Sequence, residues 1–395
     1  MSDITCPWCF GVFKDIRVQF RCINPGCSRE PDELHAKYYN LSRPELLPVV
    51  IDPEEGFISN LLGREFDRVE CPKCSVETYK KICPLCHNEL PGTCGEFRHY
   101  IFSVVGSKES GKSHFIATLL DKLKHGVGDA LDASLSALND ETIKRYTREF
   151  YEPIYKEGVV LDATRSLSSH REGKVPMIFC LKIREKGRLG DNFKVVILVF
   201  FDTAGEDLDN TDLISVEAKY IGRSDGIIFL VDPLQIREIR EKVGDSVTLP
   251  DEHTEPDTVV NNIARVIRGV NHVEIKKRIQ IPFAVTLSKF DAVKPLLPRS
   301  SDLLSPSSHG RTFDCNEFER TSSEIKALLR KWTEDSGALE RDVEHNFEDY
   351  GYFVTSSLGS SPDREGRLKV GVNPVRVADP FLWLLWKHGI IQGEE

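Results

Sequence analysis

An eight-residue segment, 106–113, constrains the fold of this chain more than any other feature. It reads Gly-Ser-Lys-Glu-Ser-Gly-Lys-Ser, follows the apolar residues 101–105, which predict a strand, and precedes residues 114–123, which predict a helix. Glycines let the backbone turn tightly and direct its N–H groups at phosphate oxygens. The pattern G-x-x-x-x-G-K-S between a strand and a helix therefore predicts a phosphate-binding loop (P-loop) in an α/β domain.

The residues of this loop have distinct expected roles. Lys112 would reach the β- and γ-phosphates of a nucleotide and act in catalysis, and the Ser113 hydroxyl would ligate Mg²⁺. Backbone N–H groups and side chains along the whole loop would line the phosphate site. The expected nucleotide contacts are Gly106, Ser107, Lys108, Glu109, Ser110, Gly111, Lys112, Ser113 and His114.

A second phosphate-facing segment follows the apolar run 195–201, which is typical of a buried parallel strand. The run leads into Asp202-Thr203-Ala204-Gly205, a D-x-x-G pattern. An aspartate at the carboxyl end of a central strand can hold the Mg²⁺ shell, directly or through water. We therefore expect Asp202 to serve Mg²⁺ and the Gly205 N–H to approach the γ-phosphate.

Two later segments indicate which base is bound. Strand-like residues 283–287 lead into Ser288-Lys289-Phe290-Asp291, close to the N-K-x-D pattern of guanine-specific proteins but with serine where asparagine is usual. Asp291 would accept hydrogen bonds from guanine N1–H and N2–H₂, a donor pair that adenine lacks, and the Lys289 stem would stack on the base. Residues 352–359 again run from a strand into a small polar loop. There the backbone N–H groups of Ser356 and Ser357 would face guanine O6.

Taken in order, these four segments resemble the Ras-like, TRAFAC-class GTPases over residues 98–390. The resemblance implies a mostly parallel sheet flanked by helices, with GTP or GDP and Mg²⁺ at the carboxyl ends of the strands. It also implies a loop threonine that contacts Mg²⁺ and the γ-phosphate. Thr164, ahead of the expected strand 177–184, is the candidate, and Ser166 and Ser168 are alternatives.

One departure from that family concerns hydrolysis. Many Ras-like proteins use a glutamine after D-x-x-G to orient the attacking water, and here that position is Glu206. A carboxylate beside a triphosphate is electrostatically unfavourable, although Glu206 would act as a catalytic base if its pKa were raised. We therefore expect slow hydrolysis that a partner accelerates.

The first 94 residues carry cysteines in four pairs. Three pairs have the spacing Cys-x-x-Cys with proline after the first cysteine, and one pair is Cys-x₄-Cys. Eight thiolates suffice for two tetrahedral Cys₄ zinc sites, which would be structural because four thiolates leave no coordination position for water. The expected ligands are Cys6, Cys9, Cys22, Cys27, Cys71, Cys74, Cys83 and Cys86.

Spacing leaves the partition of these cysteines between two sites open. The preferred arrangement joins neighbouring pairs, with Cys6, Cys9, Cys22 and Cys27 in one site and Cys71, Cys74, Cys83 and Cys86 in the other. A cross-braced arrangement stays an alternative, because a long segment separates the second pair from the third. His87 follows the last cysteine and is more simply a surface histidine than a ligand.

Composition and charge narrow the class of protein. The chain has 395 residues, of which 40% are hydrophobic and none belong to an apolar run of membrane-spanning length, so we expect a soluble globular protein without membrane association. A formal net charge of −10 argues against general nucleic-acid binding. Paired thiols without a targeting segment imply a reducing, cytoplasmic compartment. The basic residues near the cysteine pairs form a modest cluster of Lys73, Lys80, Lys81 and Arg98.

We predict two domains on these grounds, a zinc-ribbon-like region over 1–94 and a Ras-like P-loop GTPase domain over 98–395. Segments about 130–157, which looks helical, 244–275 and 292–335 exceed a minimal Ras-like core and are expected insertions. Near the C-terminus, Asp379-Pro380 predicts the start of a buried apolar helix.

The combination of features resembles one bacterial group. Cysteine pairs precede a P-loop, and the stretches Asp-Thr-Ala-Gly-Glu-Asp, DGIIFLVDPLQ and DPFLWLL follow it, as in the second, zinc-bearing type of "double-GTPase" proteins. The resemblance implies a companion GTPase or another protein effector as partner, and a role in bacterial conflict or antiviral defence. Two alternatives stay open: a nucleotide- and zinc-dependent assembly scaffold with little hydrolysis, and a zinc-ribbon ATPase that acts on nucleic acid.

Overall fold

The computed structural model describes residues 3–53, 67–161, 175–187, 190–201, 215–243, 255–333, 337–363, 365–368 and 371–395. The chain divides into two compact units. The smaller comprises Met1–Tyr100 with Glu185–Ile197, and the larger comprises Ile101–Arg184 with Leu198–Glu395. Each unit is described separately below.

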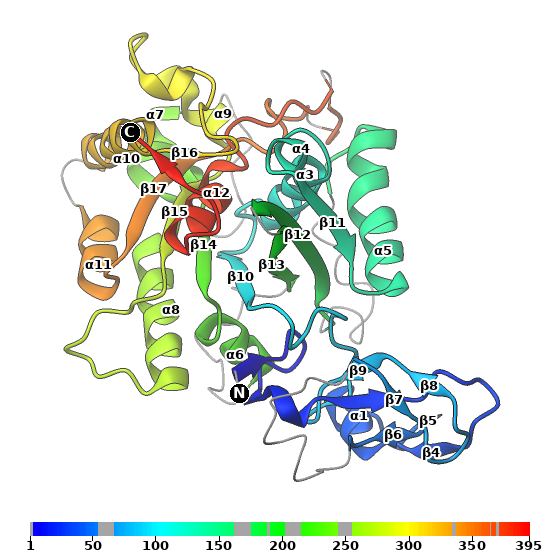
Figure 1. Ribbon diagram of the computed structural model, residues 1–395. Helices are drawn as coiled ribbons and strands as arrows, with labels where there is room; N and C mark the ends of the chain where they lie inside the picture. The colour runs from blue at the N-terminus through cyan, green and yellow to red at the C-terminus, as the bar shows by residue number, and fades with distance from the viewer. Residues whose placement is uncertain are drawn as a thin grey trace. The chain divides into compact units, whose positions relative to one another are not determined.

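A seven-stranded sheet with the order β11-β12-β13-β10-β14-β15-β17 (Figure 1) forms the centre of the larger unit, although the end of β12 and most of β13 are counted with the smaller one. The pairs β10–β14, β14–β15 and β15–β17 are all parallel, so the sheet is mostly parallel, as the sequence predicts. Their residues are almost all buried because helices cover the sheet. The strands are β10 His99–Gly106, β11 Ala133–Ala137, β12 Met177–Gly187, β13 Gly190–Phe200, β14 Gly226–Val231, β15 Phe283–Leu287 and β17 Tyr350–Val354.

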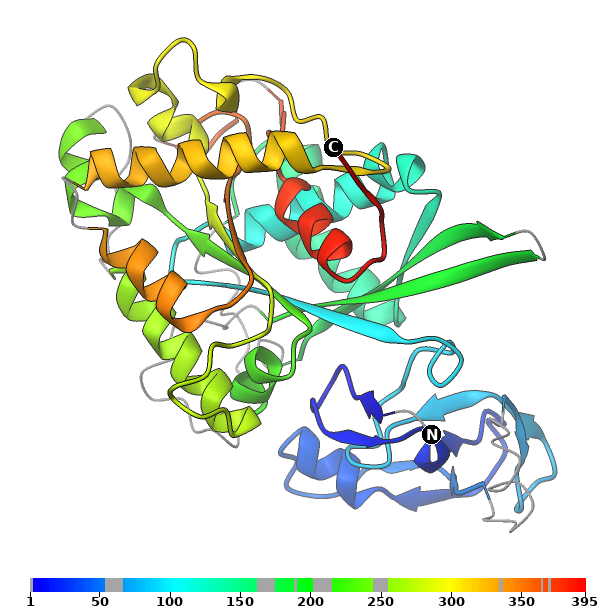
Figure 2. The ribbon, with the colours of Figure 1, turned by 60° about the vertical axis from the view of Figure 1, so that its left-hand side comes forward.

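Helices lie on both sides of this sheet, with α10 and α12 on one side and α8 and α11 on the other (Figure 2). No helix in the described part of the chain combines the length and the apolar character needed to cross a membrane. The helices are α3 Lys112–Lys124, α4 Val127–Ala130, α5 Asp140–Tyr146, α6 Val216–Gly222, α7 Arg237–Val243, α8 Pro256–Asn271, α9 Phe290–Val293, α10 Cys315–Trp332, α11 Ala338–Asn346 and α12 Asp379–Lys387.

The C-terminal helix α12 is buried, as the sequence predicts. Pro380 lies in its first turn, where a missing N–H costs nothing, and Trp383 is fully buried. A side chain at Gly226 on β14 would place its Cβ 2.7 Å from Leu384, so glycine permits the close approach of this helix to the sheet. The two-residue strand β18 Gly393–Glu394 follows α12 and pairs in parallel with β16 Phe313–Asp314, which precedes α10.

The prediction of a helix over the whole of 130–157 is wrong in its first part. Residues 133–137 form β11, which pairs antiparallel with β12 so that Leu135 faces Leu181. Hydrogen bonds to the edge of the sheet outweigh local helix propensity there. The helix begins after Asn139, whose side chain accepts from the Thr142 N–H, and it continues beyond α5 as a π-helix over Thr147–Glu157.

In its described residues, the smaller unit has short strands, the helix α1, the 3-10 turn η1 Asp15–Arg17 and an apolar cluster. Phe20, Val49 and Ile51 pack there beside the thiols of Cys22 and Cys71. Cysteines are therefore part of the core itself, and a metal bound to them would stabilise the packing around it. Its elements are β1 Asp3–Thr5, β2 Val12–Lys14, β3 Gln19–Arg21, β4 Arg29–Pro31, α1 Glu33–Tyr38, β5 Leu46–Pro48, β6 Val50–Ile51, β7 Val69–Glu70, β8 Glu77–Thr78 and β9 Lys80–Ile82.

Candidate functional site

The P-loop segment forms the predicted strand–loop–helix turn between β10 and α3. At Gly106 an added Cβ would lie 2.5 Å from Ser110 Oγ and 2.7 Å from the Leu230 carbonyl oxygen, so glycine alone fits there. Gly111 has a φ of 84° and Glu109 a φ of 59°, both in the left-handed region. These constraints wrap the loop tightly before the helix begins.

Lys112 lies inside this loop. Its side chain is buried, with 7% of the residue exposed, and its Nζ donates to the carbonyl oxygens of Gly106 at 2.9 Å and Ser107 at 2.8 Å. Lys112 and Ser113 are also the first residues of α3, whose N-terminal N–H groups carry a partial positive charge. The ammonium group and the helix terminus together make the loop attractive to an anion.

The predicted base-recognition residues come together beyond β15 and β17. Asp291 Oδ1 accepts a hydrogen bond from the Ser356 hydroxyl at 2.6 Å, and its Oδ2 accepts one from Ser361 at 2.9 Å. Ser357 follows Ser356 in the same loop. Both carboxylate oxygens of Asp291 therefore face hydrogen-bond donors, and Ser361 is a member that the sequence analysis missed.

Lys289 adopts a left-handed φ of 49° and forms an ion pair with Asp232, whose Oδ2 lies 2.6 Å from its Nζ. Asp232 is fully buried at the carboxyl end of β14. Ser288, at the position where asparagine is usual, donates from its hydroxyl to the Val231 carbonyl at 3.2 Å. The aspartate thus fixes the lysine of the motif, a role that the sequence analysis did not assign.

His114 connects α3 to the segment that follows the π-helix. Its Nε2 accepts a hydrogen bond from the Leu161 N–H at 3.0 Å. Burial lowers the pKa of the imidazole to about 4, and the nearby charge of Lys289 acts in the same direction. The histidine is therefore neutral near pH 7 and keeps its role as acceptor.

Several predicted residues fall outside the described part of the chain. Residues 162–174 and 202–214 are not described, and the candidates for Mg²⁺ binding and for hydrolysis lie within them. These candidates are Thr164, with its alternatives Ser166 and Ser168, and Asp202, Gly205 and Glu206.

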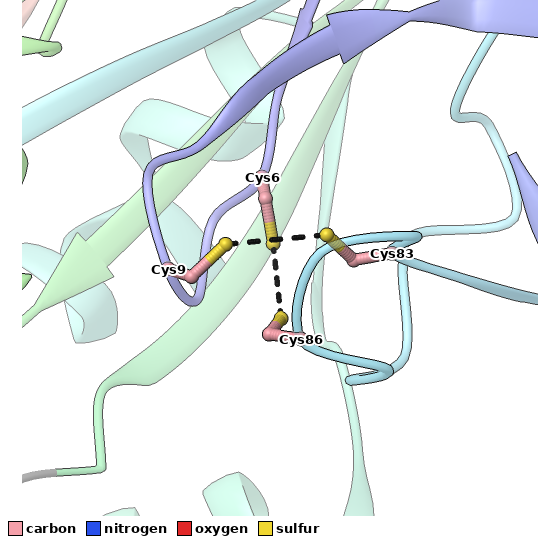
Figure 3. A group of neighbouring side chains, drawn as sticks. All are labelled: Cys6, Cys9, Cys83 and Cys86. Atoms are coloured by element: carbon pink, nitrogen blue, oxygen red, sulfur yellow. Dashed lines mark hydrogen bonds between the residues drawn. The ribbon is translucent and has the colours of Figure 1, made fainter. Parts of the chain in front are cut away.

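The smaller unit brings its eight paired cysteines into two groups of four. In one group, Cys6, Cys9, Cys83 and Cys86 point toward a common centre (Figure 3), and their sulfurs all lie within 4.8 Å of one another. The Cys6–Cys86 and Cys9–Cys83 sulfur distances are 3.8 Å and 4.0 Å. Tetrahedral zinc with Zn–S bonds of about 2.3 Å separates its sulfurs by about 3.8 Å, whereas a disulfide bond measures about 2.0 Å. The donor set and its spacing therefore fit zinc.

The second group consists of Cys22, Cys27, Cys71 and Cys74, with sulfur distances of 3.6 Å between Cys22 and Cys74 and 3.8 Å between Cys27 and Cys71. The pairs are thus nested, first with fourth and second with third. The predicted joining of neighbouring pairs is wrong, and a cross-brace that joins alternate pairs does not occur either.

Strand pairing explains the nested arrangement. β3 and β9 run antiparallel, so that Arg21 faces Lys80 and Gln19 faces Ile82. β3 separates the first cysteine pair from the second, and β9 separates the third pair from the fourth. Antiparallel pairing of β3 with β9 brings the second pair beside the third at one end of the ladder and the first pair beside the fourth at the other end.

The three Cys-Pro-x-Cys pairs share one backbone geometry. The residues that follow their second cysteines, Phe10, Ser75 and His87, have φ values of 51°, 52° and 54°. Each donates its N–H to the carbonyl of the first cysteine in the pair. His87 turns its Nδ1 to Asp32 at 2.7 Å, and in the described structure it belongs to neither cysteine group.

The chain is similar to several known proteins. A curated relative, the "Putative ESX-1 scaffolding and assembly protein SaeC" of Mycolicibacterium smegmatis, is 26% identical over 332 residues, which are 79% of this chain and 80% of the relative. Among solved structures, the nucleotide-analogue-bound small GTPase Arl6 (BBS3) of Trypanosoma brucei shares 14% identity with a TM-score of 0.29, over 75% of this chain and 100% of that one. The GTP-bound Ski7 GTPase-like domain of S. cerevisiae shares 15% identity with a TM-score of 0.29, over 75% of this chain and 51% of that one.

Residues 100–339 match the Double-GTPase 2 family. This match covers more than half of the chain, and it confirms the resemblance drawn from the P-loop and the motifs around it. The chain belongs to the Double-GTPase 2 family.

Proposed function

We propose that this protein is a guanine-nucleotide-binding switch that hydrolyses GTP slowly in the presence of Mg²⁺ and regulates a protein partner. The observation that carries the proposal is that two motifs follow the carboxyl ends of parallel strands in one sheet. The P-loop with its buried Lys112 follows β10, and Asp291 with Ser356 follows β15 and β17, which run parallel to one another. Ligands bind at the carboxyl ends of the strands in such sheets.

Guanine specificity rests on the two oxygens of Asp291. Ser356 and Ser361 hydroxyls donate to them separately, so the carboxylate offers two acceptors side by side. Guanine presents N1–H and N2–H₂ in the same spacing and would replace these donors, whereas adenine has an acceptor at N1 and no amino group at C2. The ion pair with Asp232 would hold the Lys289 stem beside the base.

Magnesium and hydrolysis complete the proposal. Ser113, Asp202 and Thr164 would ligate Mg²⁺ or its waters, and the Gly205 N–H would approach the γ-phosphate. Glu206 takes the position at which a glutamine orients the attacking water in many Ras-like proteins. Its carboxylate would repel the triphosphate, and slow hydrolysis follows from that repulsion.

Replacing Glu206 with glutamine tests this account of hydrolysis. We expect the Glu206→Gln variant to hydrolyse bound GTP at least as fast as the wild type in a single-turnover assay, because the change removes a negative charge beside the phosphates. Glu217→Gln on α6 is the matched control, since it removes a charge from a described helix instead. A large loss of rate in Glu206→Gln would show that Glu206 is the catalytic base.

The name of the curated relative supports a second candidate function, a nucleotide- and zinc-dependent assembly scaffold with little hydrolysis. Both candidates require a protein partner, for which the family description suggests a companion GTPase. Multiple-turnover phosphate release with and without that companion separates them, because only the switch should release phosphate repeatedly. The cytoplasmic location and the role in bacterial defence stay predictions from the sequence.

Direct binding tests the proposal as a whole. Titration of the zinc-loaded full chain with fluorescent GDP in Mg²⁺ should show saturable binding of one nucleotide per chain, and unlabelled GTP should reverse it. A chain that is folded, contains zinc and binds no guanine nucleotide would overturn the switch.

A further inference from the structure

A short 3-10 turn, η5 over Pro233–Gln235, follows β14 and lies between the two nucleotide motifs. Asp232 caps this turn, since its Oδ1 accepts from the Leu234 N–H at 2.9 Å. The other oxygen of the same carboxylate holds Lys289 of the base motif. One buried aspartate therefore fixes both the shape of the turn and the lysine beside the expected base.

The last residue of the turn, Gln235, contacts the P-loop. Its carboxamide is buried, with 2% of the residue exposed. The side-chain oxygen accepts a hydrogen bond from the Ser107 hydroxyl, and the Nε2 donates to the Lys108 carbonyl at 2.8 Å. Because the amide uses its acceptor toward one residue and a donor toward the next, its orientation is fixed.

These contacts control the direction of the loop backbone. Lys112 binds the carbonyl oxygens of Gly106 and Ser107, and Gln235 binds that of Lys108. Three consecutive carbonyls therefore accept hydrogen bonds. Because a peptide group is planar, fixing the carbonyl of one residue also fixes the direction of the next residue's N–H. An anion-binding loop needs this order, because its N–H groups must face the phosphate before the ligand arrives.

Ser288 does not supply such a brace. Its hydroxyl donates to Val231 at the end of the neighbouring strand. In the described residues, contacts connect the base side of the site to the P-loop. Lys289 pairs with Asp232, Asp232 caps η5, and Gln235 at the end of η5 binds the P-loop.

We propose that Gln235 is a positioning residue that holds the P-loop in its phosphate-binding conformation and couples it, through η5 and Asp232, to Lys289. The part of this inference that concerns affinity rests on the proposed nucleotide function. The part that concerns the conformation of the loop does not, so the two can fail separately.

The first measurement needs no nucleotide. Gln235→Leu keeps the size of the side chain and removes both hydrogen bonds, and Gln280→Leu, at an exposed position, is the matched control. We expect amide hydrogen exchange in the segment 106–113 of the nucleotide-free full chain to become about tenfold faster in Gln235→Leu, as expected for the loss of two hydrogen bonds. Unchanged exchange in this segment would overturn the proposal.

The second measurement distinguishes positioning from general packing. GDP and GTP place a β-phosphate in the loop and GMP does not. Gln235→Leu should therefore weaken GDP and GTP about tenfold and leave GMP unchanged. Equal weakening of all three would mean that Gln235 only supports the fold. If the wild type binds none of them, the proposed function fails and hydrogen exchange still decides the role of Gln235.

A double-mutant cycle tests the hydrogen bond between Ser107 and Gln235. The variant Gln235→Glu serves if Gln235→Leu does not fold. Ser107→Ala removes the hydroxyl that donates to Gln235. We expect its effect on GDP affinity and that of Gln235→Leu to be non-additive, because each breaks the same contact. Gln235→Glu keeps an acceptor toward Ser107 but turns a carboxylate toward the Lys108 carbonyl and the expected phosphates, so it should weaken GDP at least as much as Gln235→Leu does; additive effects and a silent Gln235→Glu would count against the brace.

Discussion

Removal of zinc should unfold the smaller unit of this chain and release two zinc ions. The Cys22 and Cys71 thiols are part of its apolar core, so loss of the metal would leave that core without the bonds that hold these cysteines together. Four thiolates gathered in one group repel one another, so each group needs a cation to balance its charge. Each structural zinc contributes on the order of 10 kcal/mol of folding free energy. Metal analysis and proteolysis of residues 1–100, with and without a chelator, measure the effect.

Double variants test the nested pairing itself. Cys6→Ser with Cys83→Ser damages one site and should leave one zinc, whereas Cys6→Ser with Cys22→Ser damages both and should leave none. Joining of neighbouring pairs predicts the reverse for these two variants. Cys315→Ser, outside both groups, should keep two zinc ions. Two zinc ions in the untreated chain with the reverse pattern in the variants would refute the nested arrangement.

Local patterns were sufficient to predict most of the larger unit. The strand that contains residues 101–105, the P-loop and α3 follow from the order of apolar, glycine and basic residues within one short segment. Residues 283–287 form β15 with the predicted bounds, and the apolar C-terminal helix is buried. In each case the information lies within a few residues of the structure that it specifies.

Pairing across long distances could not be predicted in this way. The nested cysteine groups depend on the antiparallel pairing of β3 with β9, and nothing in the spacing of the cysteines specifies that pairing. The strand β11 likewise depends on the exposed edge of β12, against which a short polar segment gains backbone hydrogen bonds. Tertiary partners decide these elements.

The same limit applies to Asp232, Gln235 and Ser361. The stretch DGIIFLVDPLQ entered the sequence analysis only as part of the family resemblance. Its meaning depends on what the turn faces, which is Lys289 on one side and the P-loop on the other. A polar residue directly after a buried parallel strand is the signal that could have identified Asp232.

Replacing Lys112 with alanine should abolish nucleotide binding at micromolar concentrations. The variant removes the ammonium group from the loop and leaves the Gly106 and Ser107 carbonyls without this donor. Charged hydrogen bonds to phosphate contribute about 2 kcal/mol each, so the loss of two lowers GTP affinity about a thousandfold. Fluorescent GTP binding to the two proteins measures it.

Lys124→Ala is the control for this variant, because Lys124 lies at the exposed end of the same helix and its loss should leave affinity unchanged. Circular dichroism of both variants shows whether the fold is kept. A folded Lys112→Ala variant that binds GTP as the wild type does would mean that the P-loop is not the phosphate site.

Base specificity is the central claim, because it separates a guanine-nucleotide switch from an ATPase of similar fold. The measurement is a competition titration of fluorescent GDP with GTP, GDP and ATP in Mg²⁺, for the wild type and for Asp291→Ala. A site that hydrogen-bonds the guanine edge should prefer GTP and GDP over ATP by more than about a hundredfold, and Asp291→Ala should lose that preference. Equal competition by ATP, or an Asp291→Ala variant that keeps the preference for guanine, would contradict the account.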